Sequence, residues 1–371
     1  MAPANQWYKI ENEDEVFSPS LLVYPERIES NIRKMLTIAG GVSRLRPHVK
    51  THKMAEIIIM QMNHGISKFK CATISEAEMA ARCGATDILL AMQPVGPNIE
   101  RFFRLKKAFQ NSDISCIADS EEILFQLSAA ATGYNMETCV WIDINAGMNR
   151  TGIVPGVEAL SMYKLADTLP NLKAGGLHVY DGHIHEKDLS LRRKICSEAF
   201  APVHKMRDDL KKASFSQVKI VAGGSPTFGI HSSGSDVELS PGTTLLWDFG
   251  YSSSFADMDF MHAAVLFTRV VSKPAGNLIC IDLGHKAVAS EMPQPRIMIP
   301  AIEDYTIAGH NEEHMVIRTD HAESMKPGDP VYAIPWHICP TVDRFDSVYV
   351  VTESRVTTRW KVEARKRQIT F

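Results

Sequence analysis

The residues that could do chemistry are densest at positions 46–53, where the chain reads Arg-Pro-His-Val-Lys-Thr-His-Lys. This segment stands where an apolar strand should end and a helix should begin. A lysine at the end of a buried strand is costly unless it is used or paired. Neighbouring cations also lower the pKa of an amine, which suits attack on a carbonyl group. Lys50 is therefore a candidate nucleophile, and a solvated basic turn is the alternative.

A second polar segment follows the apolar run Cys139–Ile144 and reads Asn-Ala-Gly-Met-Asn-Arg-Thr-Gly over 145–152. A turn flanked by glycines can hold the planar guanidinium of Arg150 against an oxyanion or a phosphate. Most surface arginines have no such partner, so this segment alone is weak support for a binding site.

A third segment is rich in histidine and begins at His178. On a strand, His178 and Tyr180 share one face because successive side chains alternate. His183 and His185 repeat this spacing, and with Asp181 nearby they could bind a metal ion. The alternative is a polar loop whose histidines are satisfied by hydrogen bonds.

Two glycine turns follow late strand candidates. One is Ala-Gly-Gly-Ser-Pro-Thr at 222–227, and the other is Ser-Pro-Gly-Thr-Thr at 240–244. Exposed backbone N–H groups in such turns can hold a phosphate. Barrels often bind phosphate with the loops after strands 7 and 8, which is where these turns fall. Each turn alone is common, but the pair indicates a phosphate site.

The last polar group is Trp-His-Ile-Cys-Pro at 336–340. If this segment is a strand, His337 and Cys339 point to the same side. Imidazole and thiolate together suit Zn²⁺, and a site with only two ligands leaves positions open for water or substrate. The alternative is a half-buried cysteine beside an unrelated histidine. Asp343 and the stretch 310–314 offer further ligands.

The elements that must position these residues are short apolar runs that alternate with helical patterns from about residue 20 to 250. Strand, crossover helix, strand is the pattern of a parallel sheet. There are nine such runs, one more than the eight strands of a (β/α)8 barrel. We expect Leu21–Tyr24 to be the surplus run, which leads into the first helix. An open doubly wound sheet is the alternative, but no G-x-G-x-x-G follows an early strand. The remaining strand candidates are Ser43–Val49, Phe69–Ile74, Ile88–Met92, Ile114–Ala118, Cys139–Ile144, Ala174–Tyr180, Val218–Ala222 and Val237–Leu239.

The pattern changes after about residue 255, where long helical patterns give way to β-like runs separated by Pro, Gly and Asp turns. We therefore expect an α/β protein in which a (β/α)8 TIM barrel over residues 20–255 is followed by a smaller all-β domain. No flexible linker separates the two parts, so we expect the domains to pack against each other.

Charge and composition exclude several classes of protein. The chain has 371 residues and a formal net charge of −3, so it has no basic excess for binding nucleic acid. No apolar run approaches the ~20 residues of a membrane span. The first residues have neither the basic end nor the apolar core of a signal peptide. The seven scattered cysteines are typical of reduced thiols, and we expect a cytoplasmic protein.

Taken together, the chain resembles the fold-type III pyridoxal-phosphate (PLP) enzymes, whose alanine-racemase-like barrel carries a C-terminal β domain. More narrowly, it resembles the D-threonine aldolase and D-serine dehydratase family. The match covers nearly the whole length, and RPHVKTHK paired with a late H-x-C-P is its most specific feature. The motifs that occur in the family's order are RPHVKTHK (46–53), GMNRTG (147–152), HVYDGH (178–183), GGSPT (223–227), SPGT (240–243) and WHICPT (336–341).

The resemblance implies a role for each of these motifs. Lys50 would form the Schiff base with PLP, Arg150 would contact the phenolic oxygen of the cofactor, and His178 and Tyr180 would line its ring. His337 and Cys339 would bind a divalent metal beside the β-hydroxyl of the substrate, with Zn²⁺ favoured over Mn²⁺ or Mg²⁺. The residues that would hold the phosphate are Gly224, Ser225, Thr227, Gly242 and Thr243.

The resemblance also implies an organisation for the molecule. Residues 1–19 would join 256–371 in the β domain that carries the metal site. The active site would lie at the interface of a homodimer. The only expected ligands are small molecules, with no nucleic acid and no membrane.

The resemblance finally implies a lyase that acts on β-hydroxy-D-amino acids. The outcome is either cleavage to glycine and an aldehyde, or elimination to a 2-keto acid and ammonia. The family pattern associates H-x-D with aldolases and H-x-C with dehydratases. The alternative is an amino-acid racemase of the alanine racemase type. Ser240 disfavours it, because a racemase carries an arginine there, and the chain also lacks the C-terminal tyrosine motif of a racemase. Two other classes are a non-catalytic PLP-carrying barrel and a zinc module without PLP.

Overall fold

The computed structural model describes residues 6–215, 217–234 and 236–371. The chain divides into two compact units. We call the first the barrel unit; it contains residues 35–50, 55–242 and 366–371. We call the second the sheet unit; it contains the residues up to Lys34, together with 51–54 and 243–365. Helix α1, Pro25–Ala39, runs from one into the other.

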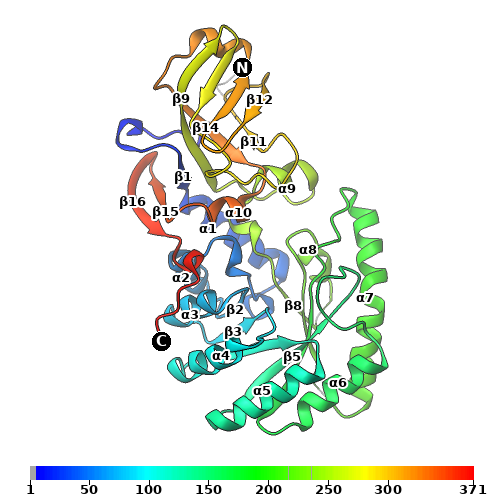
Figure 1. The fold of residues 1–371 in the computed structure, drawn as a ribbon. Coiled ribbons are helices and arrows are strands. Elements are labelled where there is room, and N and C mark those ends of the chain that lie inside the picture. Colours follow the sequence, from blue (N-terminus) through cyan, green and yellow to red (C-terminus); the bar gives the residue numbers. More distant parts are fainter. Residues whose placement is uncertain (1–5, 216, 235) are drawn as a thin grey trace. The chain divides into compact units, whose positions relative to one another are not determined.

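The barrel unit is built on one sheet of parallel strands in the order β2-β3-β4-β5-β6-β7-β8 (Figure 1). Each strand is followed by a helix or turn that returns the chain to the start of the next strand, as the alternating pattern predicts. The strands are β2 Lys68–Cys71, β3 Asp87–Leu90, β4 Asp113–Ala118, β5 Thr138–Ile144, β6 Leu172–Val179, β7 Lys219–Ala222 and β8 Val237–Leu239. The helices are α2 Ala55–Asn63, α3 Ile74–Arg82, α4 Pro97–Ala108, α5 Glu121–Tyr134, α6 Val157–Thr168, α7 Leu189–Lys212 and α8 Phe228–His231.

The eighth position of the barrel is filled by an irregular segment. The expected strand Ser43–Val49 is not continuous, because Pro47 has no N–H to donate to a ladder. The segment still bridges both edges of the sheet, since Leu45 pairs with Leu239 of β8 and His48 pairs with Lys70 of β2. These two parallel bridges close the ring, so the predicted α/β barrel is confirmed with a weak eighth strand.

Side chains from several strands form a cluster inside the barrel unit. Leu89, Ile117, Trp141 and Val221 form one buried cluster, and they come from β3, β4, β5 and β7. Gly176 of β6 is required beside this cluster, because a Cβ there would lie 2.4 Å from the carbonyl oxygen of Lys219.

The sheet unit contains the β-like runs expected after residue 255. Its strands follow the order β12-β13-β10-β9-β1-β15-β16, and β14 pairs with β9 and β11. The run expected to be surplus to the barrel is β1, Ser20–Val23, which pairs with β9 and β15 and not with the barrel sheet. The other strands are β9 Ala264–Ala275, β10 Leu278–Ile281, β11 Ile297–Met298, β12 Thr306–His310, β13 Met315–Arg318, β14 Pro330–Pro335, β15 Ser347–Thr352 and β16 Arg355–Lys361.

Part of the predicted lead-in also joins this unit. The backbone N–H of Glu11 donates to the carbonyl of Ser354, and the Asn12 amide donates to the carbonyl of Val356. Residues 1–5 of the predicted lead-in lie outside the described residues.

Two short helices stand in the sheet unit, α9 Phe249–Ser254 and α10 Ile338–Val342. A strand across 336–340 is therefore wrong: β14 ends at Pro335, and His337 is the residue before the first turn of α10.

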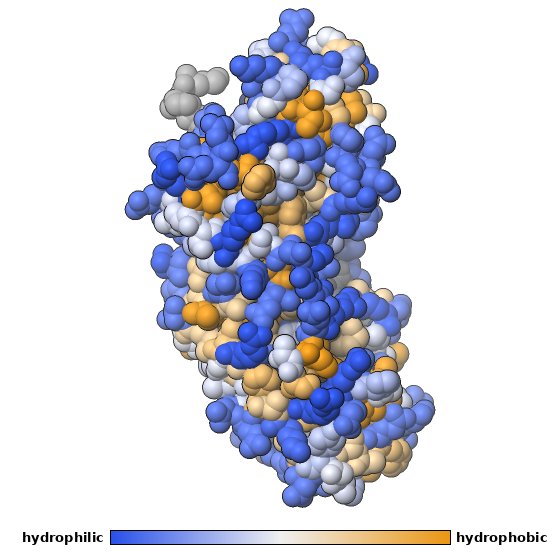
Figure 2. All heavy atoms as spheres, turned by 60° about the vertical axis from the view of Figure 1, so that its left-hand side comes forward, coloured by the Kyte–Doolittle hydropathy of each residue, from blue (hydrophilic) through white to orange (hydrophobic). Residues whose placement is uncertain are grey.

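The surface is mixed in polarity. On the face shown in Figure 2, hydrophobic residues form small separate groups among hydrophilic ones, as is usual for a surface in contact with water. Among the described residues, no helix combines the length and the apolar character needed to cross a membrane.

Candidate active site

Three cationic side chains of the barrel unit surround the ring of Tyr180, which directly follows β6. The centroid of this ring is 5.6 Å from Nζ of Lys50, 5.7 Å from Nζ of Lys70 and 4.9 Å from Cζ of Arg150. Lys50 lies in the turn after the segment that closes the ring, and Arg150 lies in the loop after β5. The structure thus brings the first three sequence candidates, Lys50, Arg150 and Tyr180, to one place.

A buried imidazole and a carboxylate lie on the neighbouring strands β5 and β6. Nδ1 of His178 is 2.7 Å from Oδ1 of Asp143. Burial lowers the pKa of His178, whereas the hydrogen bond and charge of His178 lower the pKa of Asp143 despite its burial. A neutral imidazole that donates through Nδ1 to an ionised Asp143 fits both directions. Its buried Nε2 has no hydrogen-bond partner in the described part of the chain.

The glycine turn at 222–227 is buried and is held in place by a carboxylate. The backbone N–H of Gly224 donates to Oδ1 of Asp181 at 2.8 Å. The Oγ of Ser225 accepts from the backbone N–H of Gly242 at 3.4 Å, so the two glycine turns of the sequence meet here. Thr227 precedes α8, and its backbone N–H donates to the carbonyl of Gly224. Because the Gly224 N–H is engaged by Asp181, Gly224 would shape a phosphate site rather than donate to it.

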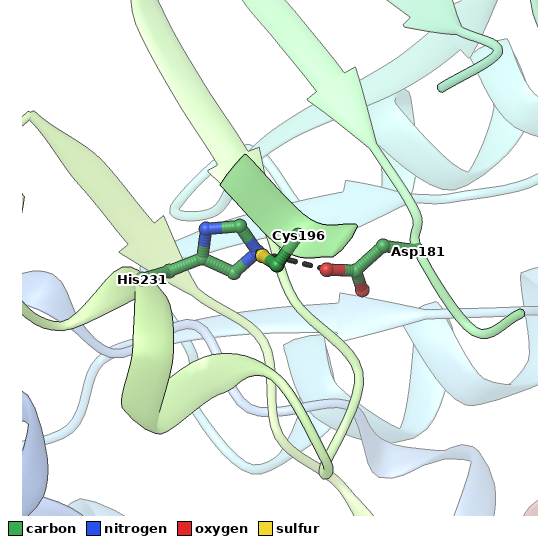
Figure 3. Close-up of side chains that lie close together, drawn as sticks. All are labelled: Asp181, Cys196 and His231. Carbon is green, nitrogen blue, oxygen red and sulfur yellow. Dashed lines mark hydrogen bonds and ion pairs between the residues drawn. The ribbon is translucent and has the colours of Figure 1, made fainter. Parts of the chain in front are cut away.

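Asp181 belongs to a second cluster, drawn in Figure 3 with Cys196 of α7 and His231 of α8. Oδ2 of Asp181 lies 2.8 Å from Nε2 of His231, and Sγ of Cys196 lies 3.5 Å from the same nitrogen. The three ligand atoms lie within 4.8 Å of one another and could hold a metal ion. Burial and the charge of Asp181 raise the pKa of the Cys196 thiol to about 12, so without a metal the cluster is a hydrogen-bonded network.

The histidines expected to join Asp181 in a metal site are elsewhere. His183 is half-buried, its Nε2 faces the backbone of Gly147, and its buried Nδ1 has no hydrogen-bond partner within the described residues. His185 is exposed.

His337 and Cys339 lie at the start of α10 in the sheet unit. Sγ of Cys339 is 3.2 Å from Oγ1 of Thr51 and 3.4 Å from Oγ1 of Thr243. Nδ1 of His337 is 2.5 Å from Oε1 of Glu291. Burial acts to lower the pKa of His337, but the hydrogen bond and charge of Cys339 and the nearby carboxylates raise it to about 9.

Three of the further carboxylates suggested for this site form ion pairs with lysines. Asp343 pairs with Lys53 at 3.7 Å, and Glu312 and Glu313 pair with Lys286.

Several residues of these sites carried no clear sequence signal. Asp143 and Lys70 lie within strand candidates, and Cys196 and His231 lie on helices. The only available signal for these four residues was that a polar side chain stands at a position facing the core. Ser240 was visible as the position of a racemase arginine, and its buried Oγ has no hydrogen-bond partner among the described residues.

A closed parallel barrel with a lysine, an arginine, a buried imidazole and paired glycine turns around one ring defines an alanine-racemase-like protein. Comparison with known families agrees. Residues 23–247 match the model of the alanine racemase N-terminal domain, and residues 263–351 match a model described as "Putative serine dehydratase domain". The chain belongs to the alanine racemase N-terminal domain family.

Comparison with individual proteins finds aldolases and a dehydratase among the relatives of this chain. A D-threonine aldolase of Arthrobacter sp. is 28% identical over 94% of this chain and 93% of its own length. The crystal structure of a D-threonine aldolase from Filomicrobium marinum superposes with a TM-score of 0.88, covering 97% of this chain and 99% of that chain at 24% identity. A D-threo-3-hydroxyaspartate dehydratase from Delftia sp. HT23 superposes with a TM-score of 0.82 over 93% and 97%, at 20% identity. All three of these relatives are lyases.

Proposed function

We propose that this protein is a PLP- and metal-dependent lyase of β-hydroxy-D-amino acids. The observation that carries the proposal is the arrangement of Lys50 and Arg150 around Tyr180, beside the unpartnered Nε2 of His178. In the described part of the chain neither Lys50 Nζ nor the Arg150 guanidinium makes a hydrogen bond or ion pair, so both are available to a ligand. These groups fit an anionic aromatic aldehyde such as PLP. When bound, PLP stabilises the negative charge that develops on the amino acid.

Each residue has a role in this proposal. Lys50 holds the cofactor and exchanges the α-proton of the substrate, which suits an amine at the mouth of a barrel. Arg150 offers a rigid donor fork to the phenolic oxygen. His178, with its unpartnered Nε2, and Tyr180 would line the cofactor ring. The residues proposed to form the phosphate site are Gly224, Ser225, Thr227, Gly242 and Thr243.

We infer a divalent metal at His337 and Cys339, with Zn²⁺ favoured over Mn²⁺ and Mg²⁺. A nitrogen and a sulfur donor suit Zn²⁺, and two protein ligands would leave room for a substrate oxygen. Glu291, which is hydrogen-bonded to Nδ1 of His337, resembles the carboxylates that orient many metal-binding histidines, and this bond would leave Nε2 to bind the metal. Thr51, which contacts Cys339, directly follows Lys50 in the chain. A bound metal would act as a Lewis acid on the β-hydroxyl group.

Two reactions fit these groups. If a base takes the hydroxyl proton, the Cα–Cβ bond breaks, and glycine and an aldehyde leave. If Lys50 takes the α-proton, hydroxide departs, and a 2-keto acid and ammonia follow. Two of the three relatives are aldolases, whereas the H-x-C pair favours the dehydratase branch. A racemase remains the alternative function.

The test is an assay of D-threonine, D-serine and 3-hydroxy-D-aspartate, with aldehyde and ammonia measured in parallel. We expect one of the two products from at least one substrate, together with visible absorbance of lysine-bound PLP. The Lys50→Ala variant should lose that absorbance and the turnover. The L-enantiomers are the control and should react poorly, as expected for a lyase that acts on D-amino acids. Racemisation of alanine without added metal, or Lys50→Ala protein that keeps the absorbance, would contradict the proposal.

We also propose, on the family resemblance, that the protein is a cytoplasmic homodimer that binds small molecules and neither nucleic acid nor membrane. Sedimentation equilibrium of the purified protein gives the check on the dimer.

A further inference from the structure

Lys70 is a second lysine beside the ring of Tyr180. It lies on β2 in the barrel unit, it is only 2% exposed, and its backbone N–H donates to the carbonyl of Pro47 in the closing segment. Its Nζ is 5.7 Å from the ring centroid, against 5.6 Å for Lys50. The strand therefore directs this ammonium group into the proposed cofactor site.

The ammonium group of Lys70 has no counter-charge in contact with it within the described residues, where it makes no hydrogen bond and no ion pair. The two carboxylates whose charges reach it are already engaged, Asp143 by His178 and Asp181 by His231. Burial, followed by the charge of Lys50, lowers the pKa of Lys70 to about 7. An unpaired buried cation costs stability, so its presence requires another explanation.

Two other lysines of the barrel unit that are fully or partly buried are paired. Lys106 of α4 donates to the carbonyl of Ile114 at 2.6 Å, and Lys68 of β2 pairs with Glu238 at 2.6 Å. Lys70 differs from both, because no group in the described part of the chain satisfies it. A buried charge kept without a partner is typical of a site where a ligand supplies the partner.

We propose that Lys70 binds an anionic oxygen of the ligand held over Tyr180, next to Lys50 and Arg150. The inference rests on the proposed function. The oxygen belongs either to PLP or to the carboxylate of the amino acid, and both are anionic oxygens that an ammonium group can bind.

The experiment compares Lys70→Met, Lys70→Arg and wild type, with Lys106→Met as the matched control for loss of a buried lysine. PLP binding to apoprotein and D-alanine binding to the PLP-loaded protein are followed by absorbance. D-Alanine has the carboxylate but no β-hydroxyl group, so it reports binding separately from the reaction. We expect Lys70→Met to weaken one of these bindings by about tenfold or more. Lys70→Arg should restore most of it.

Thermal unfolding of the apoproteins separates a binding role from a structural one. Removal of an unpaired charge should leave the unfolding midpoint of Lys70→Met unchanged or higher, whereas Lys106→Met should unfold at a lower temperature and bind normally. Weaker PLP binding assigns the oxygen to the cofactor, and a loss confined to D-alanine assigns it to the substrate.

Two results would overturn this inference and leave the proposed function standing. One is that Lys70→Met binds PLP and D-alanine as tightly as wild type. The other is that Lys70→Met unfolds at a lower temperature and Lys70→Arg binds as weakly as Lys70→Met. If wild type takes up no PLP, the proposed function fails and the role of Lys70 fails with it.

Discussion

At the scale of residues, the two groups that could hold a metal differ in what their donor atoms already bind. In the cluster of Figure 3, His231 and Asp181 satisfy each other, and Asp181 also fixes the turn at Gly224. A metal there would have to displace that bond and ionise a thiol whose pKa is raised to about 12. At α10, His337 and Cys339 also share a hydrogen bond, but the bond lies between the two proposed ligands themselves, Cys339 contacts two hydroxyl groups, and Glu291 orients the imidazole. We therefore expect the metal at α10.

A metal analysis of single variants tests this choice. His337→Ala should lower the metal content of purified protein to a small fraction of the wild-type value, because it removes one of two ligands. His231→Ala should keep the metal, although the loss of a buried partner for Asp181 should lower stability. EDTA should abolish turnover in the wild type and leave PLP bound. Retention of metal in His337→Ala, with its loss in His231→Ala, would place the ion in the cluster of Figure 3.

At the scale of elements, the barrel is closed by buried charge as well as by backbone pairing. Arg46 of the closing segment is 1% exposed and bonds to Asp87 of β3 at 2.6 and 2.7 Å and to Glu238 of β8 at 2.7 Å. Burial acts to lower the pKa of Arg46, but its hydrogen bonds and the two carboxylates raise it, so the arginine stays charged. This pairing ties the irregular eighth position to β8, which is its neighbour, and to β3, which lies one strand beyond β2.

Arg46→Met should lower the free energy of unfolding by about 3 kcal/mol, because it leaves the half-buried Asp87 without its partner and removes one of the two partners of the buried Glu238. Urea unfolding gives the measurement. Lys205→Met is the control: its ion pair with Asp209, at 2.6 Å on the surface of α7, is exposed, and we expect little change. Equal stability of Arg46→Met and wild type would show that the backbone bridges alone close the barrel.

At the scale of the whole molecule, buried histidines make stability depend on pH. Burial lowers the pKa of His52 to about 3 and that of His262 to about 4, so both are neutral in the folded protein. In the unfolded chain they take up a proton near pH 6.5. The unfolded state therefore binds more protons below that pH, and stability falls as the solution is acidified. Asp248 acts in the opposite direction, since burial raises its pKa to about 6.

We expect the free energy of unfolding to fall between pH 6.5 and 4, with each such histidine contributing up to about 1.4 kcal/mol per pH unit. His52→Gln should flatten this slope, because it removes a group that only the unfolded chain protonates. Urea unfolding at several pH values gives the measurement. A variant with the same slope as wild type would mean that His52 is protonated equally in both states.

The sequence by itself determined the order of the elements and the position of the main site residues. Strands and helices can be told apart in the sequence because their side-chain periods differ. Their alternation predicts a parallel sheet, since each helix returns the chain to the start of the next strand. The polar segments stand directly after strand candidates, and parallel strands end at one edge. The order of these segments along the chain is therefore enough to predict that Lys50, Arg150 and Tyr180 lie together.

Only the tertiary structure decided how the ring closes and what partners the buried groups find. The proline at 47 breaks the first ladder, yet single bridges on both sides close the barrel. His337 and Cys339 lie at the start of a helix, and Asp181 finds His231 fifty residues away. Lys70 is left without a partner among the described residues. The physical reason is common to all four: sequence periodicity records which residues are buried, but a hydrogen bond or an unpaired charge depends on chain segments that meet only after folding.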